Sequence, residues 1–463
     1  MKGEERELVL ARIGTAMADF CERWFPDAFV FALAAVLLVF GMGLAIGEAP
    51  STLVEAFGEG FWVLVPFTMQ MALIIIGGFV VASSRPCSRL IERIAAVPAT
   101  PRGAVAWTAF FAMTSSLLSW GFSLIFTGLL VRAIVRRLEV DYRAIGGAAY
   151  LGLGAVWALG FSSSAALMQA TRSAIPPDLL KITGVVPLSE TIFLRQNVAL
   201  ATILIAVGVA IAWLSYPRHR PPRTFASIGV VYEPLVIERE SPSTPADRIE
   251  NTPILSVAVA TIMVAFLVMR ISERGLISTL DLNNFNLAFL AAGMLLHWRP
   301  RAFLKAVVRS VPAVAGVLIQ FPFYAGVFGL ISMTSIQETL AEIFVAVTNP
   351  HTFNPIVAIY SMILDLFIPS GGGKWVVEAP YVMAAAREWS QHLGWTIQTY
   401  NAAEGLANLM NPFWMLPLMG ILNVRARDLA GYSILQLLCQ LPLVLLLCWL
   451  FNYTLPYVPP ILP

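Results

Sequence analysis

The chain of 463 residues is 58% hydrophobic and 13% charged, with a mean hydropathy of +0.76. Soluble globular proteins carry about 25% charged residues, so the composition excludes a soluble domain and predicts a helical protein that crosses a membrane many times. The net charge of +2 gives no basis for nucleic-acid binding.

The sequence contains no motif typical of an enzyme, a metal site or an ATP-driven pump. Its four cysteines and four histidines are scattered, and no GxSxG motif is present. The run of glycines before Lys374 is not a Walker loop, because Ile368 stands where the first glycine would be and Trp375 follows the lysine. We therefore expect neither catalysis nor a bound cofactor or metal.

The N-terminal segment, residues 1–26, is predicted to form an amphipathic helix on the cytoplasmic side, because it is too charged for a cleavable signal peptide. Spans are predicted at 28–46 and 61–82, with the more polar stretch 50–59 at the membrane interface. An arginine-rich loop, 85–102, follows the second span, and the positive-inside rule places it in the cytoplasm.

The apolar stretch 103–131 is interrupted by SWGFS at 119–123 and has arginines beyond both ends. Both ends are then cytoplasmic, which predicts a re-entrant hairpin with its tip at 119–123; one straight span is the alternative. The next span, 144–170, is broken by GFSSS at 160–164, and the span 191–216 returns to the cytoplasm.

The proline- and arginine-rich stretch 217–251 is predicted to be a cytoplasmic linker between two transmembrane repeats, 27–216 and 252–463. Amphipathic stretches are expected at 299–309 and 335–347. The spans expected in the second repeat are 253–269, 286–298, 311–331, 403–422 and 432–451.

A second broken hairpin is predicted at 353–386, where the sequence IPSGGGK at 368–374 interrupts a long apolar segment. Proline removes a backbone donor, and each glycine costs about 1 kcal/mol in a helix. In hydrocarbon, backbone groups freed by such a break need partners, so the break must be buried in protein or line a cavity. A loop at the membrane surface is the alternative.

The same order of span, amphipathic piece, hairpin, broken span and final span occurs in both halves. This order predicts two inverted-topology repeats, with about 9–10 transmembrane helices plus two re-entrant hairpins and a cytoplasmic N-terminus. Four breaks, at 119–123, 160–164, 369–374 and 408–412, should then meet near the middle of the membrane.

Hydroxyls, amides and exposed backbone N–H groups at these breaks suit a small carboxylate, although small residues also mediate close helix packing. The candidate substrate-binding residues are Ser119, Trp120, Gly121, Ser123, Ser162, Ser163, Ser370, Gly371, Gly372, Gly373, Lys374, Asn408 and Asn411.

Charged residues inside the membrane are functional candidates because they are costly there. Asp365 and Glu404 are candidates for ion coupling, with a proton or sodium as the coupled ion; Asp365 could instead pair with a neighbouring helix. Lys374 could neutralise an anionic substrate or extend to the interface, and Glu378, four residues on, could pair with it.

Several motifs follow one another in the order found in a known family: MQMALII at 69–75, WGF at 120–122, QFPFYAG at 320–326, PSGGG at 369–373 and NPFW at 411–414. Through them the chain resembles the bacterial short-chain fatty acid transporter family, the type linked to acetoacetate and butyrate uptake. The resemblance runs from residue 24 to residue 432. It implies a carrier of the cytoplasmic membrane, related to the ion-transporter superfamily of paired-hairpin elevator transporters.

We therefore expect a secondary active transporter of butyrate, acetoacetate or a related monocarboxylate, coupled to an ion. A homodimer is the oligomeric state considered. A carrier of dicarboxylates or other small organic anions is the alternative, and an intramembrane enzyme or a channel is a remote one. The expected partners are the anion and the lipid bilayer.

Overall fold

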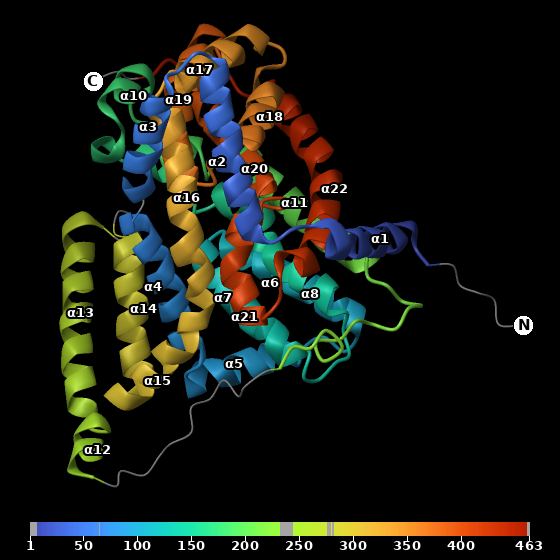
Figure 1. Cartoon of the computed structure of the whole chain (residues 1–463), viewed down its shortest axis with the longest axis vertical. Coiled ribbons are helices and arrows are strands. Elements are labelled where there is room, and N and C mark those ends of the chain that lie inside the picture. Colours follow the sequence, from blue (N-terminus) through green and yellow to red (C-terminus); the bar gives the residue numbers. More distant parts are fainter. Residues whose placement is uncertain (1–6, 64, 232–243, 276–278, 280–281, 461–463) are drawn as a thin grey trace, which may run out of the picture.

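The computed structural model describes residues 7–63, 65–231, 244–275, 279 and 282–460. Every regular element in these ranges is a helix (Figure 1). Seven helices there are long and apolar enough to cross a membrane, or up to eight if the bent pair Leu393–Ala407 and Pro412–Leu422 forms one span. The all-helical polytopic fold is confirmed. Fewer helices qualify than the expected 9–10, because the helix Leu282–His297, at the predicted span 286–298, has only 16 residues and the predicted span 403–422 belongs to the bent pair.

The first half contains helices α1 to α11. They are α1 (Val9–Trp24), α2 (Ala28–Ala45), α3 (Pro50–Val63), α4 (Val65–Ala82), α5 (Arg85–Ala95), α6 (Pro101–Ser116), α7 (Trp120–Ile134), α8 (Tyr142–Leu151), the π-helical turn η1 (Gly152–Val156), the 3-10 turn η2 (Trp157–Leu159), α9 (Ser164–Ala170), η3 (Arg172–Ala174), α10 (Pro177–Thr183), η4 (Leu188–Glu190) and α11 (Arg195–Leu214).

The second half follows the predicted linker, of which residues 232–243 lie outside the described ranges. Its helices are α12 (Pro245–Glu250), α13 (Pro253–Arg274), α14 (Leu282–His297), α15 (Pro300–Ser310), η6 (Val311–Val314), α16 (Ala315–Ser332), α17 (Ile336–Val347), α18 (Phe353–Asp365), α19 (Gly371–Glu388), α20 (Leu393–Ala407), η7 (Pro412–Met415), α21 (Leu416–Leu422) and α22 (Ala426–Asn452).

The stretch 50–59, expected as a polar piece at the interface, instead belongs to helix α3, which packs along α16. Small residues explain this contact. A Cβ atom added to Gly60 would lie 2.6 Å from the Cα atom of Gly329, so the two backbones touch. Close approach at glycine is a common way for helices to associate in membranes.

Each predicted hairpin region contains a pair of helices joined by a tight turn, and in each pair the two arms contact one another. The single straight helix considered for 103–131 is therefore wrong. That these hairpins are re-entrant stays a prediction. The tips lie slightly earlier than predicted, because Ser119 and Ser370 are N-cap residues that accept hydrogen bonds from the amides of Phe122 and Gly373, at 3.3 and 3.2 Å. The three glycines thus form the first turn of α19 rather than an unwound break.

The two predicted broken spans are also discontinuous. Between α8 and α9 the chain passes through η1, η2 and a turn, while α20 and the η7–α21 segment are inclined by 69°. The second broken span begins at Leu393, ten residues before the predicted start at residue 403. Its first helix, α20, is completely buried in protein and can therefore contain polar residues. These polar residues lower the hydropathy of the segment, so the sequence does not reveal where the helix begins.

The repeated order of elements is visible in the structure: α4, α5, α6–α7, α8–α9 and α11 correspond to α16, α17, α18–α19, α20–α21 and α22. In Figure 1 the arginine-rich α5 and the basic α15 lie toward the lower end, and α10 and α17 toward the upper end. The positive-inside rule favours the lower end as the cytoplasmic one. The inverted relation and the repeat boundaries stay predictions.

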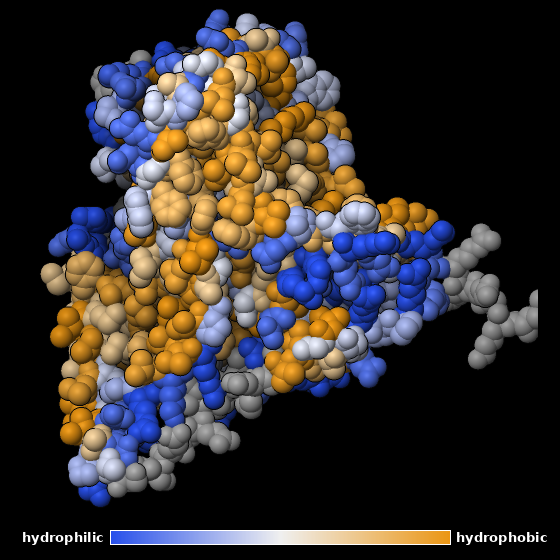
Figure 2. Space-filling model, viewed as in Figure 1, coloured by the Kyte–Doolittle hydropathy of each residue, from blue (hydrophilic) through white to orange (hydrophobic). Residues whose placement is uncertain are grey.

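Lipid-facing surface is recognisable from exposed apolar side chains. Leu37 on α2 and Ile254 and Ile262 on α13 are each about 70% exposed (73%, 70% and 69%). Figure 2 shows hydrophobic side chains over much of the visible face, with hydrophilic side chains gathered along α1. A soluble protein would not leave so much apolar surface uncovered.

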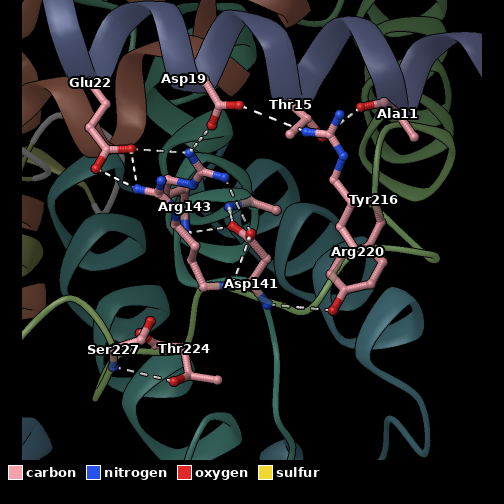
Figure 3. Close-up of polar contacts among 12 residues, drawn as sticks. Ala11, Thr15, Asp19, Glu22, Asp141, Arg143, Tyr216, Arg220, Thr224 and Ser227 are labelled. Atoms are coloured by element: carbon pink, nitrogen blue, oxygen red, sulfur yellow. Dashed lines mark hydrogen bonds and ion pairs between the residues drawn. The ribbon is translucent and has the colours of Figure 1, made fainter.

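Helix α1 is fixed to the body of the protein by an ion-pair network (Figure 3). It packs against α22, and its Asp19 and Glu22 accept hydrogen bonds from Arg143 at 2.8 and 3.3 Å. The Arg143 side chain is only 4% exposed and also lies 3.6 Å from Asp141. Arg223, in the described part of the linker, pairs with Glu22 as well. One buried arginine thus joins the N-terminal helix to α8.

Replacing Arg143 with methionine should destabilise the protein, because Asp141 would remain buried without its counter-charge. The expected loss is on the order of 3 kcal/mol, measured by thermal unfolding of the purified protein in detergent. Lys181→Met is the matched control, since Lys181 and its partner Asp178 are 71% and 88% exposed. Equal midpoints for the two variants would contradict the structural role of Arg143.

A pH-dependent contact joins the loop after α2 to the loop after α16. The hydroxyl and the backbone amide of Ser335 donate to Glu48 and lower the pKa of its carboxyl; the amide distance is 2.7 Å. A lowered folded-state pKa stabilises the protein above the unfolded pKa, and this contribution is lost as the pH falls through the folded value. The unfolding midpoint of Glu48→Gln should therefore lie below that of the wild type at neutral pH and approach it below about pH 4. A constant difference would contradict the assignment.

Candidate functional site

A cavity of about 860 Å³ lies where the two hairpin tips meet the first broken span. Three of the four predicted breaks contribute several residues each. No residue of the fourth break, 408–412, is among the described lining residues, which instead include Trp414 of η7, two residues beyond that break. The described polar and glycine residues that line the cavity are Ser119 and Gly121 at the start of α7, Ser162, Ser164 and Thr171 in and around α9, Ser370, Gly371, Gly372 and Gly373 at the start of α19, Gln70 on α4 and Asn283 on α14.

Three helices, α7, α9 and α19, begin at the cavity wall. The first amides of a helix have no intrahelical acceptor, and the helix dipole adds partial positive charge there. Gly121, Gly371 and Gly372 occupy the first two positions of α7 and α19 and carry no side chain to cover these amides. The cavity therefore presents a positive backbone potential, which suits an anion.

Among the described residues that line the cavity, none has a charged side chain. The remaining wall is largely apolar, with Trp120, Trp157, Trp414 and Ile74 among its members. The rings of Trp120 and Trp414 meet edge to face at 5.1 Å between centroids. The cavity thus offers partial positive charge to the charged group of a small anion and apolar side chains to its tail.

The first hairpin tip is held by the break in the α8–α9 segment. Ser162 accepts a hydrogen bond from the amide of Trp120 at 2.9 Å and donates to the carbonyl of Ser116 at 2.8 Å. The amide of Phe161 donates to the carbonyl of Leu117 at 2.7 Å. A Cβ atom at Gly160 would lie 2.3 Å from that same carbonyl oxygen, so only glycine fits. The hydroxyl of Ser162 is thus already engaged in positioning the tip.

Five predicted substrate-binding residues do not line the cavity. Ser123 is one turn inside α7 and donates to the carbonyl of Ala112 at 2.7 Å, while Ser163 caps α9 by accepting from Ala166. Asn408 and Asn411 are buried, and the Asn411 side chain donates to the carbonyl of Asp365 at 3.3 Å. The fifth residue, Lys374, points away from the cavity into the protein.

Lys374 is completely buried between α18, α19 and α20, so its predicted extension to the interface is wrong. Its ammonium group lies 3.5 Å from Asp365, which does pair with a neighbouring helix. The expected partner Glu378 instead accepts a hydrogen bond from Ser361. Glu404 lies directly behind Gly371, since a Cβ atom added there would be 2.4 Å from its Oε1 atom. The candidate ion-coupling residues, Asp365 and Glu404, therefore lie behind the second tip and not in the cavity.

Sequence reasoning missed two parts of the cavity wall. Gln70 donates to Asn283 at 2.8 Å, which connects α4 with α14 at the cavity. The sequence does indicate this pair, because the side-chain amides of Gln70 and Asn283 lie in or next to apolar segments. Trp157 had no such signal, because a buried tryptophan next to a helix break resembles an ordinary core residue.

Comparisons with known proteins agree closely over the whole chain. The family model described as "Short chain fatty acid transporter" matches residues 9–451. A relative from Escherichia coli (strain K12), named "Putative short-chain fatty acid transporter", is 33% identical over 93% of this chain and 97% of its own length. A relative of the same name from Haemophilus influenzae is 28% identical over 95% of this chain and 99% of its own length.

Two solved transporter structures are more distant. The Alcanivorax borkumensis YdaH transporter is 14% identical, with a TM-score of 0.46 over 94% of this chain and 100% of its own. Neisseria gonorrhoeae MtrF, described as one of a class of antimetabolite efflux pumps, is 12% identical, with a TM-score of 0.43 over 95% of this chain and 98% of its own.

The geometry of the cavity predicts which serines react from water. In a background whose native cysteines are replaced by serine, Ser119→Cys and Ser370→Cys should react with a water-soluble maleimide at least about tenfold faster than Ser123→Cys and Ser163→Cys. The first two positions line the cavity, whereas the other two are fully buried. Mass spectrometry of the labelled protein gives the rates. Equal labelling of all four would show that the tips are arranged differently.

Proposed function

The chain belongs to the short-chain fatty acid transporter family, and on this premise we propose that it carries butyrate, acetoacetate or a related short monocarboxylate across the cytoplasmic membrane as an ion-coupled secondary transporter. Membership makes it a membrane-embedded transporter of a small organic substrate and not an enzyme. The observation that supports this substrate best is the uncharged cavity at which three helices begin.

In this proposal the substrate carboxylate binds the free amides of Gly371, Gly372 and Gly121, with the hydroxyls of Ser119 and Ser370 beside them. These groups supply hydrogen bonds and partial positive charge. Because no lysine or arginine among the described lining residues forms a full ion pair with the carboxylate, the substrate can still be released. The alkyl chain lies against Trp120 and Trp414. Burial of each methylene group contributes about 0.8 kcal/mol.

A dicarboxylate is less well matched. Its second carboxylate would face a wall that offers no lysine or arginine among the lining residues. Burying a charge without a counter-charge is costly, and a second set of helix termini would be needed to offset it. The same argument disfavours other multiply charged anions.

Alternating access would follow from the inverted repeats, whose two hairpins meet at the cavity from opposite sides of the membrane. The hairpins and broken spans would move as one core against a scaffold formed by the remaining spans. A second copy of the chain, packed on that scaffold in a homodimer, would hold it still while the core moves.

The proposal predicts saturable exchange of butyrate that depends on the space at Gly372. A Cβ atom there would lie 3.5 Å from the nearest atom of Ser164, so alanine fits and valine does not. Gly372→Val should raise the half-saturating butyrate concentration at least about tenfold, equal to about 1.4 kcal/mol. Gly372→Ala is the matched control and should stay near the wild-type value.

The measurement is counterflow of radiolabelled butyrate into proteoliposomes preloaded with unlabelled butyrate, with protein-free liposomes to subtract passive entry of the neutral acid. Unlabelled acetoacetate should compete and succinate should not. Competition by succinate as strong as by butyrate would favour the dicarboxylate carrier. Flux that never saturates would favour a channel.

A further inference from the structure

Behind the second hairpin tip lies a buried group of charges that binding of a carboxylate does not use. The ammonium group of Lys374 lies 3.5 Å from Asp365, donates to the carbonyl of Ser361 at 3.0 Å and lies 4.4 Å from the centre of the Tyr400 ring. Ser361 also donates its hydroxyl to Glu378. Lys374, Asp365 and Glu378 are all 0% exposed.

Glu404 completes the group and is the member closest to the cavity. It is 1% exposed, and its Oε1 atom has no hydrogen-bond partner. This atom lies against Gly371, at 2.4 Å from where a Cβ atom would be, and the other face of Gly371 lines the cavity. Oxygen atoms of Asp365 and Glu378 also lack hydrogen-bond donors. The group therefore presents more acceptors than donors, and a proton bound to one of these oxygen atoms would supply a donor.

The charges in this group do not balance. One lysine faces three carboxylates, so the group carries −2 when all four are ionised. The other ionisable side chains around it are tyrosines, which stay neutral at physiological pH: Tyr150 and Tyr324 near Asp365, Tyr360 and Tyr381 near Glu378, and Tyr400. Two uncompensated charges at zero exposure are very costly, so the group must take up positive charge.

Protons can meet this need without a built metal site. Within the ranges that the structure describes, no three His, Cys, Asp or Glu side chains are grouped closely enough to hold a metal ion by themselves. A sodium site made of backbone carbonyl oxygens is the alternative. A proton needs only one carboxylate oxygen, and binding converts that oxygen from an acceptor into a donor. The unpaired oxygen atoms are thus suited to protonation one at a time.

Glu404 is placed so that its charge affects the substrate. The hydroxyl of Tyr400 donates to the carbonyl of Gly371 at 2.8 Å, which ties α20 to the first turn of α19. An ionised Glu404 carboxylate lies near the N-terminus of α19, on the side away from the cavity. The substrate carboxylate would lie near the same N-terminus, on the cavity side. Two like charges on either side of one glycine repel strongly where water is excluded. Protonation of Glu404 removes this repulsion.

We propose that Glu404, with Asp365, Glu378 and Lys374 around it, is the proton-binding site that couples entry of the carboxylate to entry of a proton. The inference rests on the proposed function, because it needs the anion at Gly371. A proton binds the carboxylate of Glu404, the anion then binds the N-terminus of α19, and both are released on the other side. Because coupling is reciprocal, the anion must also raise the affinity of the site for the proton.

The first test needs no variant. Butyrate is added to weakly buffered detergent-solubilised protein at a series of pH values from neutral upward, and a pH-indicator dye reports proton uptake. Uptake should rise with pH toward about one proton per butyrate bound, because the free site loses its proton as the pH rises and the anion favours the protonated site. Binding of butyrate without proton uptake would overturn the inference and leave the proposed function standing. Absence of butyrate binding and counterflow would overturn the proposed function itself.

The second test uses Glu404→Gln, which mimics the protonated residue at nearly the same size. This variant should retain butyrate counterflow, and its apparent affinity should no longer depend on pH between about 5 and 8. An inward proton gradient should no longer drive accumulation above the level in protein-free liposomes. Glu338→Gln on the outer face of α17 is the matched control, since Glu338 is exposed and should leave coupling intact.

Wild-type accumulation by Glu404→Gln under a proton gradient would overturn the inference, as would wild-type uptake driven by a sodium gradient alone. If Glu404→Gln is not stable enough to purify, Gly371→Ala replaces it. An added methyl group at Gly371 displaces the Glu404 carboxylate, whereas the Cβ atom of Gly58→Ala, on α3, meets nothing within 4 Å. Altered proton uptake per butyrate bound in Gly371→Ala, with an unaltered value in Gly58→Ala, is the expected result, and equal values would overturn the inference.

Discussion

The structure depends on one constraint: backbone groups freed by a helix break inside a membrane must find partners in the protein. The breaks supply these partners to one another. Phe161 donates its amide to Leu117, Trp120 donates its amide to Ser162, and the Asn411 side chain donates to the carbonyl of Asp365. Each break is thus stable only beside another, which brings the hairpin tips and broken spans to one place. The cavity is the space that remains where the free amides of the hairpin tips face one another.

This arrangement separates two electrostatic tasks. Toward the cavity, the protein offers partial charges from helix ends, which attract an anion without forming a full ion pair. Behind the tip, it keeps full charges at zero exposure, held by Lys374, Ser361 and Tyr400. A single glycine residue separates the two environments. Gly371 has this position because any side chain would enter the space of the Glu404 carboxylate.

Much of this could be predicted from the sequence, because prolines, glycines and serines inside apolar segments reveal where helices must break. Both helical hairpins, both broken spans and the meeting of three of the four breaks at one cavity follow from such residues, whereas none of the described lining residues comes from the break at 408–412. The sequence does not reveal which residue caps the new helix. Each residue turns a helix by about 100°, so a cap at Ser119 directs Ser123 toward α6. Lys374 was misplaced for a similar reason: only the packing of α18 and α20 determines that its side chain extends inward.

The contact between Gly60 and Gly329 bears on how the molecule can deform. Where two backbones touch, no side chain lies between them that could change rotamer while one helix slides along the other. Phe57 adds to this, because its ring fills the space that a Cβ atom on Gly326 would need. Helices α3 and α16 therefore form a rigid seam. Any sliding surface in this protein has to run elsewhere, and the seam marks a part of the fold that keeps its shape throughout a transport cycle.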